Sequence, residues 1–177
     1  MTKILSVDDD AIIREMIVDI LETKDYEIVS AVNGRAGIEA ARQHLPDLII
    51  CDVEMPDMNG WAMLEEVRKC KELQETPFIF LTGLNSMQNL RQGMNLGADD
   101  YLTKPFTYQE LTQAVETRLA RHQAVTQKYA EELEDAGKKI ENALYYDANT
   151  GLPNRKRMKE SLLSTLNSSE HQNLSVL

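Results

Sequence analysis

Residues 48–57 constrain the fold of this chain more than any other stretch. They read Leu-Ile-Ile-Cys-Asp-Val-Glu-Met-Pro-Asp, so an apolar run is followed directly by a carboxylate. Such a run is too apolar for a strand with one exposed face, but it suits a strand covered on both faces in a parallel sheet. Asp52 stands where the run stops, and Pro56 forces a loop soon afterwards. We therefore predict that Asp52 lies at the carboxyl end of a buried strand, the edge at which open α/β sheets bind ligands.

Composition limits the classes of protein that fit. The 177 residues are 42% hydrophobic, enough for one domain of ordinary size with a real core, plus an extension. The formal net charge of −10 opposes non-specific attraction to nucleic acids or anionic membranes, so we expect neither as a direct partner. Cys51 and Cys70 are typical of free thiols in a reducing compartment. No signal peptide or membrane-spanning run is found, and we expect a cytoplasmic location.

Strand patterns alternate with helix patterns along the first two thirds of the chain. Strands are predicted near 3–7, 26–32, 48–52, 78–82 and 101–104, with helices near 13–21, 36–45, 61–67 and 86–96, and a last helix after 107. The first helix carries one apolar face, with Asp10 as its cap: Ile13, Met16, Ile17, Ile20 and Leu21. Such alternation predicts an α/β fold, a flavodoxin-like five-stranded parallel sheet of order 2-1-3-4-5, within residues 1–122.

Acidic residues gather at one edge of this predicted sheet. Asp8 and Asp9 follow the first strand and Asp52 follows the third, which is its neighbour. Two carboxylates about 4 Å apart repel by about 4 kcal/mol at an effective dielectric near 20, so the cluster needs protons or a cation. Oxygen ligands favour Mg²⁺, which also takes phosphate oxygens. Thr82 and Lys104 end the fourth and fifth strands at the same edge, and both suit an incoming phosphate.

These residues form motifs that resemble a known family. Asp8-Asp9, Asp52 within Asp-Val-Glu-Met-Pro-Asp-Met-Asn-Gly, and Thr82 before a small residue occur in that order. The run 97–106, Gly-Ala-Asp-Asp-Tyr-Leu-Thr-Lys-Pro-Phe, follows them. Together they resemble the receiver domain of two-component response regulators over residues 1–122.

The resemblance implies a phosphoryl-acceptor site. Asp52 would accept a phosphoryl group, as an acyl phosphate, from a sensor histidine kinase or phosphotransfer protein. Asp9 and Asp52, with the backbone carbonyl of Glu54, would ligate Mg²⁺, and Asp8 would act through water. Transfer to a carboxylate needs mainly positioning and charge neutralisation, which agrees with this set.

The resemblance also implies a switch. Thr82 and Lys104 would bind the phosphoryl oxygens, and Tyr101 would be the aromatic that turns inward on activation. The bond before Pro105 would be cis. Movement of Thr82 toward a phosphorylated Asp52 would repack the face made by the fourth and fifth units, which is our predicted dimer surface.

Plainer interpretations and other classes remain open at this stage. Taken singly, the acidic run is a solvated loop or helix cap, and Thr82, Tyr101 and Lys104 are ordinary packing or surface residues. A phosphohydrolase of the haloacid dehalogenase type also uses a strand-end aspartate, but its Asp-x-Asp-x-Thr motif lies on the first strand. Here the candidate aspartate lies on the third, and Pro56 stands in place of the threonine. A receiver-like scaffold without phosphorylation is the third alternative.

From residue 107 onward the pattern becomes helical and continuous. Apolar or small residues recur alternately three and four apart, the spacing of a two-stranded coiled coil: Leu111, Val115, Leu119, His122, Thr126, Tyr129, Leu133, Ala136 and Ile140. We predict that the 107–145 helix leaves the domain, that 123–146 is a coiled-coil linker, and that the chain is a homodimer. Polar members and Gly137 make the coiled coil marginal. The alternative is a single surface helix with an ordinary apolar stripe.

A second resemblance begins at Asp147. The segment Asp-Ala-Asn-Thr-Gly-Leu-Pro-Asn-Arg is similar to the Asp-x-Leu-Thr-Gly-Leu-Pro-Asn-Arg start of diguanylate cyclase (GGDEF) domains, with Asn149 in place of leucine. Residues 147–177 are too few for that domain and lack its Gly-Gly-Asp/Glu-Glu-Phe loop, so we expect this chain to be no enzyme and to be part of a longer cyclic-di-GMP regulator. Residues 166–177 are expected to be disordered. A helix cap and turn is the alternative reading.

Overall fold

The structure is a computed structural model that describes residues 1–83, 97–147 and 150–172. The chain divides into two compact units, Met1–Ala124 and Val125–Leu177. The helix predicted at 86–96 lies outside the described residues.

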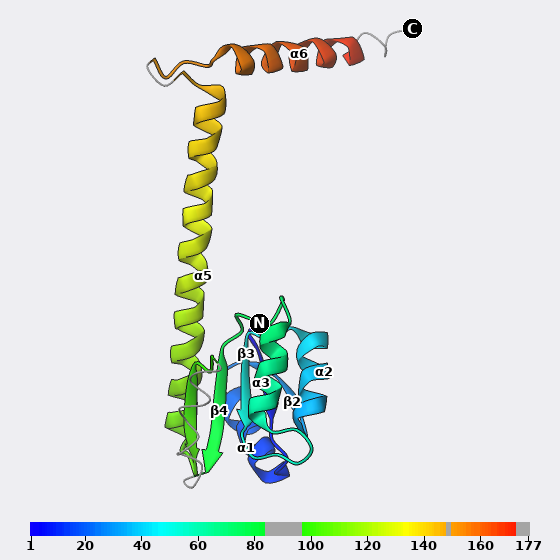
Figure 1. The fold of residues 1–177 in the computed structure, drawn as a ribbon, viewed down its shortest axis with the longest axis vertical. Coiled ribbons are helices and arrows are strands. Elements are labelled where there is room, and N and C mark those ends of the chain that lie inside the picture. Colours follow the sequence, from blue (N-terminus) through cyan, green and yellow to red (C-terminus); the bar gives the residue numbers. More distant parts are fainter. Residues whose placement is uncertain (84–96, 148–149, 173–177) are drawn as a thin grey trace. The chain divides into compact units, whose positions relative to one another are not determined.

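The described elements alternate as the sequence predicts (Figure 1). The strands are β1 (Lys3–Val7), β2 (Glu27–Ala31), β3 (Leu48–Asp52), β4 (Phe78–Gly83) and β5 (Asp100–Lys104). The helices are α1 (Ala11–Glu22), α2 (Gly34–His44), α3 (Gly60–Lys69), α5 (Tyr108–Tyr145) and α6 (Arg155–Gln172).

The strands form one parallel sheet of order β2-β1-β3-β4-β5, so the predicted flavodoxin-like fold is confirmed. In its register Val7 pairs with Cys51, and Cys51 pairs with Phe80. Asp8, which follows Val7, and Asp52, which follows Cys51 and ends β3, therefore lie at the same edge of the sheet. This edge holds the site described below.

Strand β3 is buried along its whole length, which explains its unbroken apolar sequence. Ile49 and Cys51 point into the core that α2 and α3 cover, while Leu48 and Ile50 point into the core on the opposite face. That second core includes buried residues of α1 and of the first turns of α5: Ile17, Leu21, Leu111, Val115 and Leu119. Parallel strands covered on both faces take such continuous apolar runs.

Side-chain caps start the helices that follow the strands. Asp10 Oδ1 accepts a hydrogen bond from the backbone N–H of Ile12 at 2.8 Å, which confirms the predicted cap. Asn59 caps α3 in the same way, so the loop after β3 ends at a fixed point. On the apolar face of α1, Ile17 and Leu21 are fully buried, whereas Met16 is 36% exposed.

Gly60 allows α3 to start against the backbone of β3. A Cβ atom built at this position would lie 2.4 Å from the carbonyl oxygen of Asp52. We expect Gly60→Ala to lower the free energy of unfolding by about 2 kcal/mol, because overpacking forces the backbone apart. Urea unfolding measures this. Gly137→Ala is the matched control, since its Cβ meets nothing within 4 Å and should stabilise α5 by about 1 kcal/mol. An unchanged unfolding midpoint for Gly60→Ala would contradict the close approach.

Helix α6 of the second unit extends to Gln172. The expectation of disorder from residue 166 stays a prediction. Asn154 caps its first turn through the N–H groups of Lys156 and Arg157. Within the described residues, no helix has the length and apolarity needed to cross a membrane.

Candidate functional site

Three carboxylates meet at the carboxyl edge of the sheet. Asp8, Asp9 and Asp52 each offer an oxygen that lies within 4.8 Å of the other two. Asp8 is fully buried and Asp52 is 7% exposed, whereas Asp9 is exposed. The structure thus brings together the predicted carboxylates, two of them in a low-dielectric position where an uncompensated negative charge is costly.

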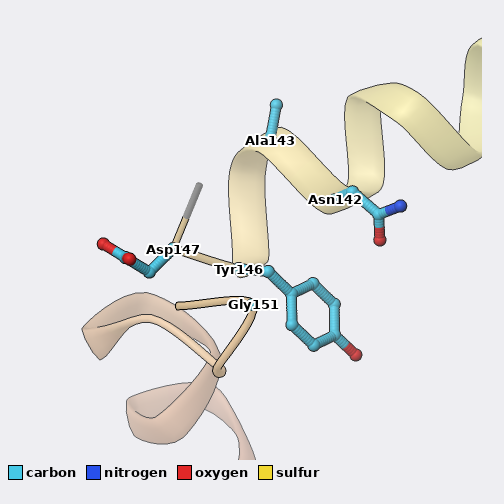
Figure 2. A pocket seen from close by; sticks show the side chains of 5 residues that line it. All are labelled: Asn142, Ala143, Tyr146, Asp147 and Gly151. Atoms are coloured by element: carbon cyan, nitrogen blue, oxygen red, sulfur yellow. The ribbon is translucent and has the colours of Figure 1, made fainter. Parts of the chain in front are cut away.

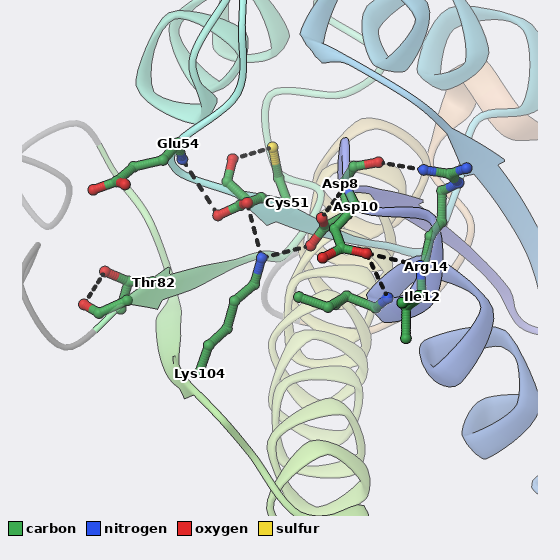
Figure 3. A network of polar contacts seen from close by, with 11 residues as sticks. Asp8, Asp10, Ile12, Arg14, Cys51, Glu54, Thr82 and Lys104 are labelled. Atoms are coloured by element: carbon green, nitrogen blue, oxygen red, sulfur yellow. Dashed lines mark hydrogen bonds and ion pairs between the residues drawn. The ribbon is translucent and has the colours of Figure 1, made fainter.

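Lys104 supplies a positive charge to this cluster. Its Nζ lies 2.7 Å from Asp8 Oδ2 and 2.8 Å from Asp52 Oδ2 (Figure 3). Burial raises the pKa of Asp8, and the Lys104 ammonium opposes that rise. Burial by itself lowers the pKa of Lys104, but its bonds to Asp52 and Asp8 outweigh this, so the pKa lies above its usual value. Lys104 therefore stays charged between the two carboxylates. The Lys104–Pro105 bond is cis.

The loop after β3 holds the Asp52 side chain in place. The backbone N–H of Glu54 donates a hydrogen bond to Asp52 Oδ1 at 3.3 Å, so the two oxygens of Asp52 have different partners. The N–H of Val53 donates to the carbonyl of Leu81, and that of Gly60 donates to the carbonyl of Val53, both at 3.0 Å. These bonds fix the point where the chain leaves the strand, and with it the direction of the carboxylate.

Thr82 and Tyr101 lie on the neighbouring strands. Thr82 is buried, and its hydroxyl donates to the carbonyl of Gly83 at 3.3 Å. Tyr101 pairs with Phe80 in the sheet and is 40% exposed. The sequence places both residues on the correct strands. Their roles in a switch remain predictions.

Sequence reasoning missed several polar contacts, one next to the site and others at the opposite edge of the sheet. Arg14 on α1 donates to the backbone carbonyl of Asp8 at 2.7 Å. Arg68 on α3 pairs with Asp99 at 3.2 Å, an aspartate to which no role is assigned from the sequence. These contacts join residues that are distant along the chain or involve a backbone atom, so no local sequence pattern predicts them.

Asp100 is a further residue whose contact was not foreseen. It pairs with Arg118 on α5 at 2.9 Å, and Asp99 accepts a hydrogen bond from the N–H of Phe78 at 2.9 Å. The amino end of β5 is thereby tied both to α5 and to β4. Asp99 and Asp100, which the sequence suggests are only loop residues, therefore hold the start of β5 in place.

Cys51 lies next to Asp52 but is chemically shielded. Its side chain is fully buried, and burial raises the pKa of its thiol well above the ordinary value. Cys70 is less buried. Because the thiolate is the reactive form, we expect the folded chain to titrate one thiol rapidly with Ellman's reagent at pH 8, and Cys70→Ser to remove that reaction. In urea both thiols should react. Rapid labelling of folded Cys70→Ser would contradict the burial of Cys51.

The donor set fits a magnesium ion. Hard divalent cations take oxygen ligands, and three carboxylates converge here from the ends of β1 and β3. An exposed member, Asp9, leaves an approach from solvent. A cation held here would add to the neutralisation that Lys104 provides, and would supply charge compensation for a phosphoryl group next to Asp52.

Sheet order, the carboxylate cluster and the strand-end lysine define a receiver-type α/β domain. Residues 4–116 match the response regulator receiver domain family, and the chain belongs to this family. It therefore carries the receiver domain of a response regulator of two-component signalling.

Solved structures and curated relatives agree with this assignment. The chain is 34% identical to the chemotaxis protein CheY4 of Vibrio cholerae, with a TM-score of 0.64 over 67% of this chain and 98% of that chain. It is 36% identical to the DNA-binding dual master transcriptional regulator RpaA of Synechocystis, over 72% of this chain and 53% of that protein. The transcriptional regulatory protein HprR of Escherichia coli is also 36% identical, over 70% and 54%. The chain thus spans about half the length of these curated relatives.

Proposed function

We propose that Asp52 accepts a phosphoryl group from a histidine kinase or a phosphotransfer protein. The observation that carries the proposal is that Asp52 shares Lys104 with Asp8 in a largely buried cluster at the carboxyl edge of the sheet. A carboxylate oxygen of Asp52 would attack phosphorus, the bond from phosphorus to the donor's nitrogen or oxygen would break, and an acyl phosphate would form. Lys104 would neutralise charge on the transferred group, as phosphoryl transfer requires.

Mg²⁺ is the proposed cofactor. Asp9, Asp52 and the backbone carbonyl of Glu54 would hold the ion, and Asp8 would act through water. The convergence of the three carboxylates supports this set. The ion would offset the charge of the incoming phosphoryl group.

The proposed response to phosphorylation is a local rearrangement. Thr82 donates to Gly83 and has a hydroxyl that can turn toward an oxygen on a phosphorylated Asp52. Tyr101, which is partly exposed, would then move inward. This would repack the face of β4 and β5 and favour dimerisation through it.

The direct test is chemical labelling of the full chain. With Mg²⁺ and acetyl phosphate, intact mass spectrometry should find one added phosphoryl group, and a chelator should prevent the addition. Sustained hydrolysis of a generic phosphate ester would instead favour the phosphohydrolase alternative. A chain that takes up no phosphoryl group and does not hydrolyse the ester would favour a receiver-like scaffold without phosphorylation.

We also propose that the chain forms a homodimer through α5, in addition to the receiver face. Large apolar residues on its distal part are exposed: Val125, Tyr129, Leu133, Ile140 and Leu144. The charged residues of that part form ion pairs four residues apart, such as Glu134 with Lys138 and Asp135 with Lys139, each at 2.6 Å. One face of the helix is therefore well solvated while the other is apolar, as coiled coils require.

Deleting residues 123–177 tests the proposed coiled coil. If this seam drives association, the shortened chain should sediment as a monomer at concentrations at which the full chain is dimeric. Residues 1–122 lie within the compact first unit, so the deletion leaves the core of that unit intact. An unchanged sedimentation profile would place the dimer contact on the receiver face.

The type of output domain that the receiver controls is a separate proposal. The segment that starts at Asp147 supports a diguanylate cyclase-type output domain encoded after this chain, whereas the curated relatives are transcriptional regulators. A cytoplasmic location is supported by the free thiols Cys51 and Cys70. The coding sequence beyond Leu177 decides between the two outputs: a Gly-Gly-Asp/Glu-Glu-Phe loop supports the first, and a DNA-binding domain contradicts it.

A further inference from the structure

The turn between α5 and α6 is closed by hydrogen bonds within the second unit. Tyr146 pairs with Pro153 as an isolated antiparallel bridge, and the N–H of Asp147 donates to the carbonyl of Leu152 at 2.8 Å. A hollow lies beside this turn, lined by Asn142, Ala143, Tyr146, Asp147 and Gly151 (Figure 2). Residues 146–147, after α5, are thus paired with residues 152–153, before α6.

Asn154 is bonded to both helix ends. Its side-chain Nδ2 donates to the carbonyl of Leu144, in the last turn of α5, at 2.8 Å. Its Oδ1 accepts from the N–H groups of Lys156 at 3.0 Å and Arg157 at 3.2 Å, in the first turn of α6. Its own N–H donates to the carbonyl of Tyr145 at 2.8 Å. One residue therefore satisfies two of the carbonyls at the end of α5 and two of the N–H groups at the start of α6.

Arg157 adds two further contacts between the start of α6 and the end of α5. The guanidinium of Arg157 lies 4.8 Å from the ring centre of Tyr146, and its Nη1 lies 3.4 Å from Glu141 on α5. Cation–π and ion-pair contacts of this kind are weak singly at exposed sites. Together with Asn154 they connect the first turn of α6 to the last two turns of α5.

We propose that Asn154 couples the end of α5 to the start of α6, so that the two helix ends open and close as one unit. A displacement that reaches the last turn of α5 is then passed into α6 and is not lost in the connecting turn. The proposal depends on contacts inside the second unit and does not rest on phosphorylation of Asp52.

Residue-resolved amide hydrogen exchange on the full chain tests this coupling. Asn154→Ser keeps an oxygen that can cap α6, because serine is about as good a cap as asparagine, but it loses the amide that reaches Leu144. We expect exchange to rise about fivefold at residues 145–147 and, by the same factor, at 158–160, the effect of one lost hydrogen bond in a shared unit.

A control variant changes the same end of α5 without altering Asn154. Asn142→Ala removes an exposed asparagine from the same end of α5, and it should leave exchange at 158–160 unchanged. A rise confined to 145–147 in Asn154→Ser would show that the caps act independently and would overturn the proposal. Unchanged exchange in both segments would overturn it as well.

Discussion

The Asp52→Asn variant is expected to take up no phosphoryl group from acetyl phosphate and Mg²⁺. An amide at this position has the shape of the carboxylate but lacks the anionic oxygen that attacks phosphorus. Asp52 lies beside Lys104 and is 7% exposed, whereas Asp8, which shares the same lysine, is fully buried, so we expect Asp52 to be the member of this pair that a phosphodonor reaches. Intact mass spectrometry after a short incubation measures the loss, which should be complete.

Asp57→Asn is the matched control for this experiment. Asp57 belongs to the same loop, is exposed, and has a φ of 64°, a conformation that asparagine adopts readily. This variant should be labelled as the parent chain is. Full labelling of Asp52→Asn would mean that another carboxylate, such as Asp8 or Asp9, is the acceptor.

Replacing Lys104 by Met should lower the free energy of unfolding by about 3 kcal/mol in the absence of Mg²⁺, because it leaves buried carboxylates without a cation. The side chains of Asp8 and Asp52 are 0% and 10% exposed, so water screens them little. Urea unfolding with and without Mg²⁺ measures the effect. The ion should restore part of the lost stability, since it would supply the missing positive charge.

A double-mutant cycle separates this electrostatic effect from lost packing. Asp8→Asn combined with Lys104→Met should cost less than the sum of the single changes, because the neutral side chain no longer needs a counter-charge. Additive costs, or an unchanged midpoint for Lys104→Met, would show that the ion pairs contribute little to stability.

Local patterns were sufficient for most of the fold. The apolar run that ends at Asp52 predicts a buried strand, and the register of β1, β3 and β4 explains why Asp8 and Asp52 meet. This works because strand ends in a parallel sheet are set by hydrophobic runs and turn residues, which can be read along the chain. The carboxylate cluster follows from that order.

The remaining features depend on contacts that no local pattern encodes. Arg68 reaches the carbonyls of Thr76 and Gly97, at 2.8 and 2.9 Å, and such backbone partners leave no trace in residue identity. The helix of residues 155–172 was missed because its face is weakly apolar, and its start depends on Asn154. Caps can be found in sequence only when an apolar stripe marks the helix that follows.

Both ends of β5 are held by ion pairs to other elements. At its amino end, Asp99 pairs with Arg68 and Asp100 pairs with Arg118, on opposite sides of the sheet. At its carboxyl end, Lys104 pairs with Asp8 and Asp52 of the carboxylate cluster. A charge added to Asp52 would therefore act first on Lys104, at the carboxyl end of β5, while the pairs with Arg68 and Arg118 hold the amino end. We expect the resulting strain to fall on this one strand.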